Sequence, residues 1–223
     1  KNLTKLSSLS YLKDKNSNES YCKINDIIEN NKDLIILTGN YSNFFGKLFY
    51  SNKTKIFEKM IKELSRHFVN RFYIEIQRHS EQKEKNYENY LLKVSHQESI
   101  PLIATQEVYY LKPEMSEAHD ALICIGEKQF IDDQNRFRYS NQHYLKSHQE
   151  LKELFSDIPE ALENNYNFHL RFNFKPKKSK PILPSITSIK EISVEEELKN
   201  QAKAGLELRL KNFIQKKQTN ISD

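Results

Sequence analysis

Short apolar runs alternate with amphipathic stretches along the first half of the chain. The run at residues 34–39 is continuous and ends at glycine, as in a strand buried on both faces, and residues 72–77 and 102–105 also predict strands. Between them, residues 53–68 and 81–97 repeat apolar side chains at helical spacing. This order favours parallel strands joined by right-handed crossovers. We therefore predict an α/β unit in the first half of the chain.

The pattern beyond this unit is mainly helical. Residues 116–125 place apolar side chains on one face of a helix. Ser-x-x-Glu pairs at residues 147–150 and 193–196 predict capped helix starts, and Pro159 fits the first turn of another helix. The helix after residue 193 is amphipathic, with little chain left to cover its apolar stripe. We therefore expect the partner of this last helix to lie outside the chain.

A basic, proline-containing stretch separates the last helix from the rest. Residues 171–180 contain five cations around Pro176 and no acidic residue, and Pro181 and Pro184 follow, which is typical of an extended linker. We divide the chain into an N-terminal helix and linker (1–33), an α/β and helical body (34–170), the basic linker (171–192) and a terminal helix (193–223).

Composition limits the class of protein more than its function. The chain has 223 residues, a formal net charge of +5 and a mean hydropathy of −0.77, which together indicate a polar, folded, cytoplasmic protein. Cys22 and Cys124 form no CxxC pair, so we expect ordinary core residues in a reducing compartment. No apolar run approaches the roughly 20 residues that span a bilayer. The start at Lys1, without methionine, leads us to expect a piece of a longer protein.

Most motifs of phosphate and metal chemistry are absent from the sequence. Gly39 to Lys47 has the wrong spacing for a phosphate loop, and Leu48 stands where a magnesium-binding Ser or Thr belongs, so we predict a turn there. No Asp-x-Asp pair is present for two-metal catalysis, and the seven histidines form no His-x-His or His-Glu-x-x-His motif. His79 follows a predicted strand, where α/β folds place ligands, but an ordinary hydrogen-bonded histidine is the interpretation we favour. The basic linker contacts phosphates or is a solvated connector, and we favour the connector.

Stretches over essentially the whole chain resemble, in order, the bacterial DNA polymerase III alpha subunit. The most specific is Phe72-Tyr73-Ile74-Glu75-Ile76-Gln77-Arg78-His79, which is similar to the family's FYLELQRHG segment. The other stretches are Leu34–Gly39, Pro101–Tyr110, Glu117–Gly126, Tyr144–Ser147, Leu154–Leu162 with Asn164, Leu183-Pro184 and Leu198–Leu210. This resemblance implies a partial (β/α) barrel of the PHP type, with residues 34–170 as the C-terminal half of a PHP domain. Residues 193–223 are then the start of the polymerase body.

The resemblance also suggests where a metal site once lay. In metal-binding members of the family, the ligands correspond to His79, Glu107 and Tyr109 of this chain. A neutral phenol is a poor ligand beside imidazole, and Glu107 is one methylene longer than the family's aspartate. We therefore expect a degenerate site, no catalytic residue and no cofactor in this segment, with Mg²⁺ serving the full polymerase. Half a barrel should also expose an open sheet edge.

The resemblance implies a role in DNA replication, as part of a DNA-directed DNA polymerase, a nucleotidyltransferase, in the cytoplasm. We favour a structural and partner-docking portion that is inactive by itself. The implied partners are the remainder of the alpha subunit, the proofreading 3′–5′ exonuclease, the sliding clamp, the clamp loader and DNA, with no membrane. Two alternatives stay open: a PHP-type metal-dependent phosphoesterase or exonuclease, and a truncated non-catalytic remnant.

Overall fold

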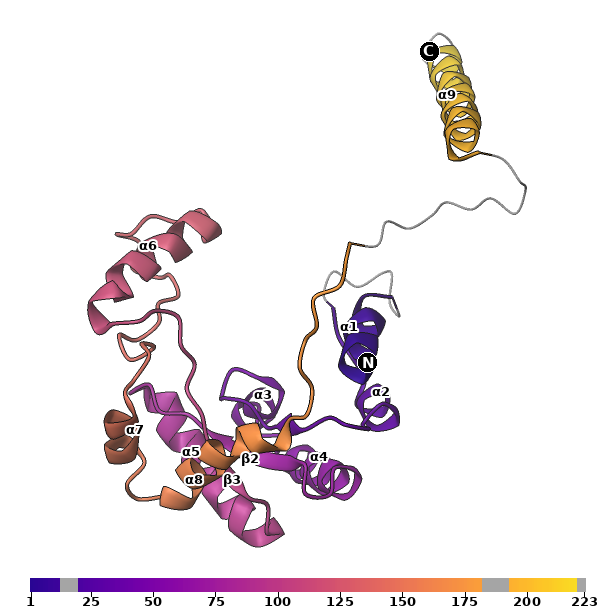
Figure 1. Ribbon diagram of the computed structural model, residues 1–223. Helices are drawn as coiled ribbons and strands as arrows, with labels where there is room; N and C mark the ends of the chain where they lie inside the picture. Colours follow the sequence, from indigo (N-terminus) through magenta and orange to yellow (C-terminus); the bar gives the residue numbers. More distant parts are fainter. Residues whose placement is uncertain (13–19, 182–192, 220–223) are drawn as a thin grey trace. The chain divides into compact units, whose positions relative to one another are not determined.

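The structure is a computed structural model, which describes residues 1–12, 20–181 and 193–219 (Figure 1). The chain forms two compact units, Lys1–Asn173 and Phe174–Asp223. The elements, in chain order, are α1 (Asn2–Leu12), α2 (Ile24–Glu29), β1 (Ile36–Leu37), α3 (Phe44–Tyr50), α4 (Thr54–His67), β2 (Phe72–Ile76), α5 (Gln82–Glu98), β3 (Leu102–Ala104), η1 (Pro113–Met115), α6 (Ser116–Glu127), α7 (His148–Leu154), α8 (Pro159–Phe168), η2 (His169–Arg171) and α9 (Val194–Thr219). Residues 13–19, 182–192 and 220–223, parts of the predicted first, third and fourth segments, lie outside the described residues.

A small parallel sheet organises the first unit. Its order is β1-β2-β3, with Ile36 opposite Phe72 and Ile74 opposite Leu102. The predicted parallel pairing is therefore confirmed. The predicted burial of the first strand on both faces is wrong, because β1 is a two-residue edge strand whose residues are only half-buried. The unit is a mixed α/β structure, and the described strands do not close into a barrel.

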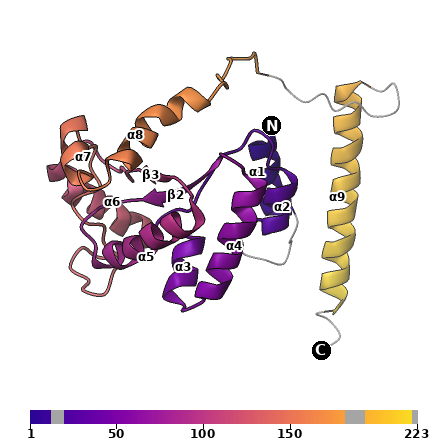
Figure 2. The same cartoon turned by 90° about the horizontal axis from the view of Figure 1, so that it is seen from below.

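The main core lies between the sheet and the helices α4 and α5. Phe57, Ile61 and Leu64, at helical spacing on α4, are buried, as the sequence pattern predicts. The Phe57 ring packs edge-on against Phe45 and Tyr90, with centroids 5.1 Å away in both cases. Helices α3 and α4 lie side by side in Figure 2 and contact one another. Each buried aromatic or aliphatic side chain of this kind stabilises the fold by about 2 kcal/mol.

Two short helices were not predicted from the sequence. Helix α2 lies in the stretch expected to be a linker, and it begins where the Asp26 carboxylate accepts a hydrogen bond from the Lys23 amide at 3.2 Å. Helix α3 lies in the segment after Gly39 that we expected to be a turn. At six and seven residues, both helices are too short for a clear helical period, so tertiary packing determines them.

Helix α8 covers the free edge of β3. The side-chain amides of Asn164 and Asn165 donate to the carbonyls of Leu102 and Ala104 at 2.7 and 2.6 Å. In Figure 1 this helix runs beside β2 and β3, and it contacts β3. The expectation of an open edge is therefore wrong for this side of the sheet, because two asparagines satisfy the carbonyls that a further strand would pair.

The second half of this unit follows the predicted helix pattern at its caps. Ser147 Oγ accepts from the Glu150 amide at 3.2 Å, while Glu150 accepts from the Ser147 amide at 2.7 Å, which completes the predicted capping box. The α6 helix is present, but its expected apolar face is not buried. Leu122 and Ile125 are 63% and 76% exposed, while Cys124 is buried.

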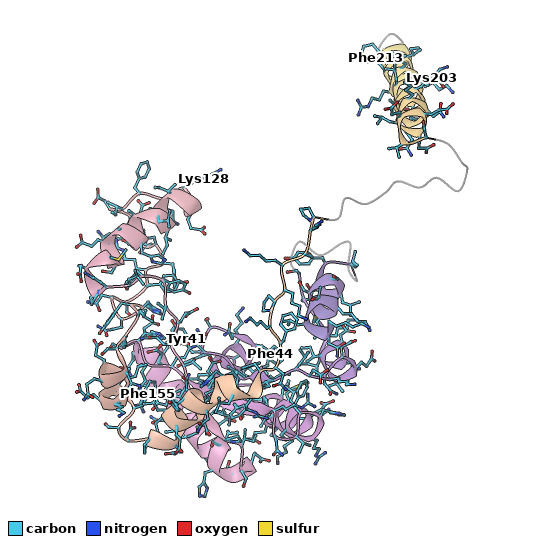
Figure 3. The ribbon with its side chains drawn as sticks, in the orientation of Figure 1. Tyr41, Phe44, Lys128, Phe155, Lys203 and Phe213 are labelled. Atoms are coloured by element: carbon cyan, nitrogen blue, oxygen red, sulfur yellow. The ribbon has the colours of Figure 1, made fainter. Side chains whose placement is uncertain are left out.

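The second unit contains α9, which begins where Ser193 Oγ accepts from the Glu196 amide at 3.2 Å. The predicted capped start of this helix is confirmed. Apolar side chains along it, such as Leu206 and Phe213, are exposed, and Figure 3 shows Phe213 standing out from the helix. Among the described helices, none combines the length and apolar character needed to cross a bilayer.

Candidate functional site

The residues that carry candidate chemistry follow the carboxyl ends of the three strands. Gly39 to Tyr41 follow β1, Gln77 to His79 follow β2, and Thr105 to Glu107 follow β3. Because the carboxyl ends of parallel strands lie at one edge of a sheet, these segments converge, as α/β folds require of a ligand site. The parallel sheet therefore brings His79 and Glu107 together.

His79 is buried, and protein groups occupy both of its ring nitrogens. Nδ1 lies 2.7 Å from Glu84 Oε1, and the Glu107 amide donates to Nε2 at 3.2 Å. The His79 amide donates to the second Glu84 oxygen at 2.6 Å. These contacts assign the proton to Nδ1. In this arrangement, His79 is bound to Glu84 in the first turn of α5 and offers no free lone pair to a metal.

Glu84 joins His79 to the start of helix α5. Its Oε2 also accepts from the Glu81 amide at 3.2 Å, as in a capping box. Burial raises the pKa of Glu84, but the hydrogen bonds from His79 and Glu81 outweigh it, so the pKa is lowered from its usual value. Glu84 is therefore a buried carboxylate whose charge is satisfied by the protein.

Glu107 and Tyr109 form a second part of the same network. The Tyr109 hydroxyl donates to Glu107 Oε1 at 2.7 Å and lies 3.1 Å from the Tyr139 hydroxyl. Glu107 Oε2 accepts from Asn40 Nδ2 at 3.3 Å. Burial, together with hydrogen bonds to Tyr139 and Glu107, raises the pKa of Tyr109. The phenol therefore stays protonated at neutral pH, which does not suit a metal ligand.

The remaining carboxylates at this edge are also held by protein donors. Glu75 accepts from the Gly39 amide at 3.0 Å and from the Thr105 hydroxyl, and Glu81 accepts from the Tyr41 hydroxyl. In the described part of the chain, no three His, Cys, Asp or Glu side chains are grouped so that they could hold a metal ion. The donor set at this edge does not fit a bound metal, and the expectation that none binds stays a prediction.

His143 is the residue at this site that the sequence did not identify. It is buried, and its ring stacks on that of His79 with centroids 4.0 Å apart and planes 3° apart. Nδ1 lies 3.2 Å from the Glu107 carbonyl, whereas Nε2 is buried without a hydrogen-bond partner among the described residues. The loop holding His143 pairs with the chain after β3, where the Tyr109 amide donates to the His143 carbonyl at 2.9 Å. No local motif marks this long-range pairing.

Burial and the neighbouring His79 lower the pKa of His143. A histidine whose pKa is lowered on folding takes up its proton more readily in the unfolded chain, so it destabilises the fold as pH falls below about 6.5. We expect the free energy of unfolding to decrease from pH 7 to pH 5.5, and His143→Gln to weaken this dependence. Urea unfolding at several pH values measures it.

The exposed His96 on α5 provides the control for this measurement. A His96→Gln variant makes the same substitution at an exposed position, and we expect it to keep the pH dependence of the original protein. Equal pH dependence in the original protein and in His143→Gln would show that His143 does not cause the loss of stability at low pH.

Comparison with known protein families places part of this chain. Residues 1–79 match the PHP domain family. Over 212 residues, or 95% of the chain, it is 35% identical to the DNA polymerase III subunit alpha of Caulobacter vibrioides. It is 34% identical over 94% of the chain to that of Rickettsia bellii, and 32% identical over 97% to that of Pseudomonas aeruginosa. The chain spans 18% of the length of each of these relatives.

Proposed function

Since this chain is homologous, over about 95% of its length, to one segment of bacterial DNA polymerase III alpha subunits, we propose that it is a structural, non-catalytic portion of such a subunit. The subunit, acting in the cytoplasm, would synthesise DNA on a template. In it, residues 34–170 form the C-terminal half of a PHP domain, and residues 193–223 begin the polymerase body. Magnesium would be held by carboxylates elsewhere in that subunit, because the chain has no Asp-x-Asp pair.

The observation that carries this proposal is the state of His79, Glu107 and Tyr109. Hydrogen bonds within the protein occupy both ring nitrogens of His79 and both carboxylate oxygens of Glu107. A catalytic metal site instead keeps a coordination position open for water or substrate. The hydrogen-bond network therefore favours a structural role for this edge of the sheet, as a rigid surface for packing.

Exposed apolar side chains support a docking role within a larger assembly. Leu122 and Ile125 on α6 and Leu206 and Phe213 on α9 are all more than half exposed. Exposed apolar side chains that lie together on a surface mark interaction sites. We assign them to contacts with the remainder of the alpha subunit, and by the same proposal the proofreading exonuclease, the sliding clamp and the clamp loader are partners of the assembled subunit.

A chimera tests the proposal. The chain replaces its matching segment in the Caulobacter vibrioides alpha subunit, and primer extension is measured for the chimera, for the subunit lacking the segment and for the chain alone. We expect extension by the chimera and none by the chain alone. An inactive, aggregated chimera, or extension by the chain alone, would refute the proposal.

The phosphoesterase alternative has a separate test. The purified chain is dialysed against Zn²⁺ or Mn²⁺, and its metal content and hydrolysis of a phosphodiester are measured. We expect less than one bound ion per chain and no hydrolysis. One ion per chain, lost together with hydrolysis in His79→Ala, would establish the alternative.

A further inference from the structure

The net positive charge of this protein is concentrated in one short segment. Arg171, Lys175, Lys177, Lys178 and Lys180 lie within ten residues that contain no acidic side chain. The other 30 basic residues of the chain equal its 30 acidic residues in number. The whole formal excess of +5 therefore comes from residues 171–180, which we call the basic segment.

The sequence keeps the basic segment extended. Residues 172–181 form no helix or strand. Pro176 and Pro181 disfavour the helical conformation of the residues that precede them, Lys175 and Lys180. An extended chain rises about 3.1 to 3.3 Å per residue, so the four lysines are spread along about 16 Å.

The four lysines are available to a partner. All of residues 171–181 are exposed. Arg171 is engaged, because its guanidinium lies over the Tyr73 ring, 5.6 Å from the centroid, and donates to the Tyr73 hydroxyl. By contrast, no hydrogen bond or ion pair joins Lys175, Lys177, Lys178 or Lys180 to another described residue.

The chemistry of these lysines fits the phosphates of nucleic acid. Duplex DNA carries one negative charge per about 1.7 Å of axis, so 16 Å of duplex offers about nine phosphates to four ammonium groups. Sites for single strands combine cations with aromatic side chains that stack on bases. The two aromatic residues of the basic segment, Phe172 and Phe174, both precede the four lysines, and none lies between Lys175 and Lys180 to stack on bases, which favours the outside of a duplex.

We propose that the basic segment, through Lys175, Lys177, Lys178 and Lys180, contacts the phosphate backbone of duplex DNA without reading its sequence. The choice of DNA over other polyanions rests on the proposed function. The contact would hold duplex near the polymerase and would add affinity without adding base specificity.

The test measures binding of the full chain to a 20-base-pair fluorescent duplex by anisotropy, between 50 and 200 mM salt. Four neutralised phosphates give a slope of log K against log salt of about −3.6, which is about a 150-fold loss of affinity over this range. In the quadruple variant K175Q/K177Q/K178Q/K180Q we expect most of the affinity and most of this slope to be lost.

The control is a second quadruple variant with the same change of charge. Lys55 and Lys59 on α4 and Lys83 and Lys85 on α5 are exposed, and their replacement by glutamine lowers the net charge equally. We expect this variant to keep at least half of the slope. An equal loss in both variants would refute the proposal, because total charge and not the segment would then determine binding.

Two other probes identify the partner. We expect weaker binding to a single strand of the same length and to vesicles that contain phosphatidylserine. Tighter binding to either probe, or no salt-dependent binding to duplex, would overturn the proposal. A functional chimera whose isolated segment does not bind DNA would refute the DNA contact alone, so the two proposals fail independently.

Discussion

Replacing Gly46 with alanine is expected to destabilise the first unit by about 3 kcal/mol. Gly46 is buried in α3, and a Cβ atom there would lie 2.1 Å from the Tyr41 carbonyl oxygen and 2.4 Å from the Tyr41 Cα. Real Cβ atoms do not approach other atoms this closely, and the obstacle is backbone and not a flexible side chain. The turn from Gly39 to Asn43 must therefore move, together with the packing of Phe45.

Gly126 provides the matched control for this prediction. It lies in α6, and a Cβ atom there would meet no atom within 4 Å among the described residues. Gly126→Ala should be neutral or stabilise by up to about 1 kcal/mol, because alanine favours helix over glycine. Urea unfolding, followed by circular dichroism, measures both variants. Similar free energies of unfolding for the two alanine variants would contradict the close packing of α3 on its preceding turn.

The structure also explains why residues 39–47 do not form a phosphate loop. Glycine at 39 and at 46 suggests a loop that wraps a ligand, but the two glycines serve the protein's own backbone. Gly39 adopts a positive φ of 78° after β1, and Gly46 allows α3 to begin against Tyr41. A spacing pattern cannot distinguish these uses, because both need a residue without a side chain.

Local patterns in this chain predicted the longer helices and the parallel strands, but neither the short helices α2 and α3 nor the contacts between elements. The helical period of α4 and the capping box at Ser147 are short-range features, and both are present in the structure. The pairing of Asn164 with β3 and the stacking of His143 on His79 join residues more than 60 positions apart. Such contacts depend on how elements pack, which no spacing along the chain encodes.

The candidate site was predicted in the same partial way. The resemblance to a known family placed His79 and Glu107 near each other, and the structure joins them through the Glu107 amide. It did not indicate that Glu84, five residues after His79, accepts from both its ring and its amide. Glu84, in the first turn of α5, thus binds the ring of His79, and this contact follows from where α5 begins.

Arg78, the neighbour of His79, should contribute more to stability than any other charged residue at this edge. Its guanidinium donates to Glu88 at 3.1 Å from Nε and to Asp157 at 2.7 and 2.8 Å. It also lies 4.9 Å from the centre of the Phe155 ring and donates to the Leu154 carbonyl. One side chain thus connects the end of β2 to α5 and to the turn between α7 and α8.

We expect Arg78→Met to destabilise the fold by about 3 to 4 kcal/mol, because methionine keeps the apolar contact with Phe155 but leaves the Glu88 carboxylate without its partner. The side chain of Glu88 is 14% exposed, so water cannot fully replace the guanidinium. Chemical unfolding at pH 7 measures this loss.

Asp157→Asn is the control, because the Asp157 side chain is 59% exposed and its ion pair is therefore worth less than about 1 kcal/mol. The difference in the free energy of unfolding between the two variants measures the contribution of the buried pair between Arg78 and Glu88. If Arg78→Met were no more destabilising than Asp157→Asn, the pair with Glu88 would contribute nothing, and the connection between β2, α5 and α7 would depend on apolar packing alone.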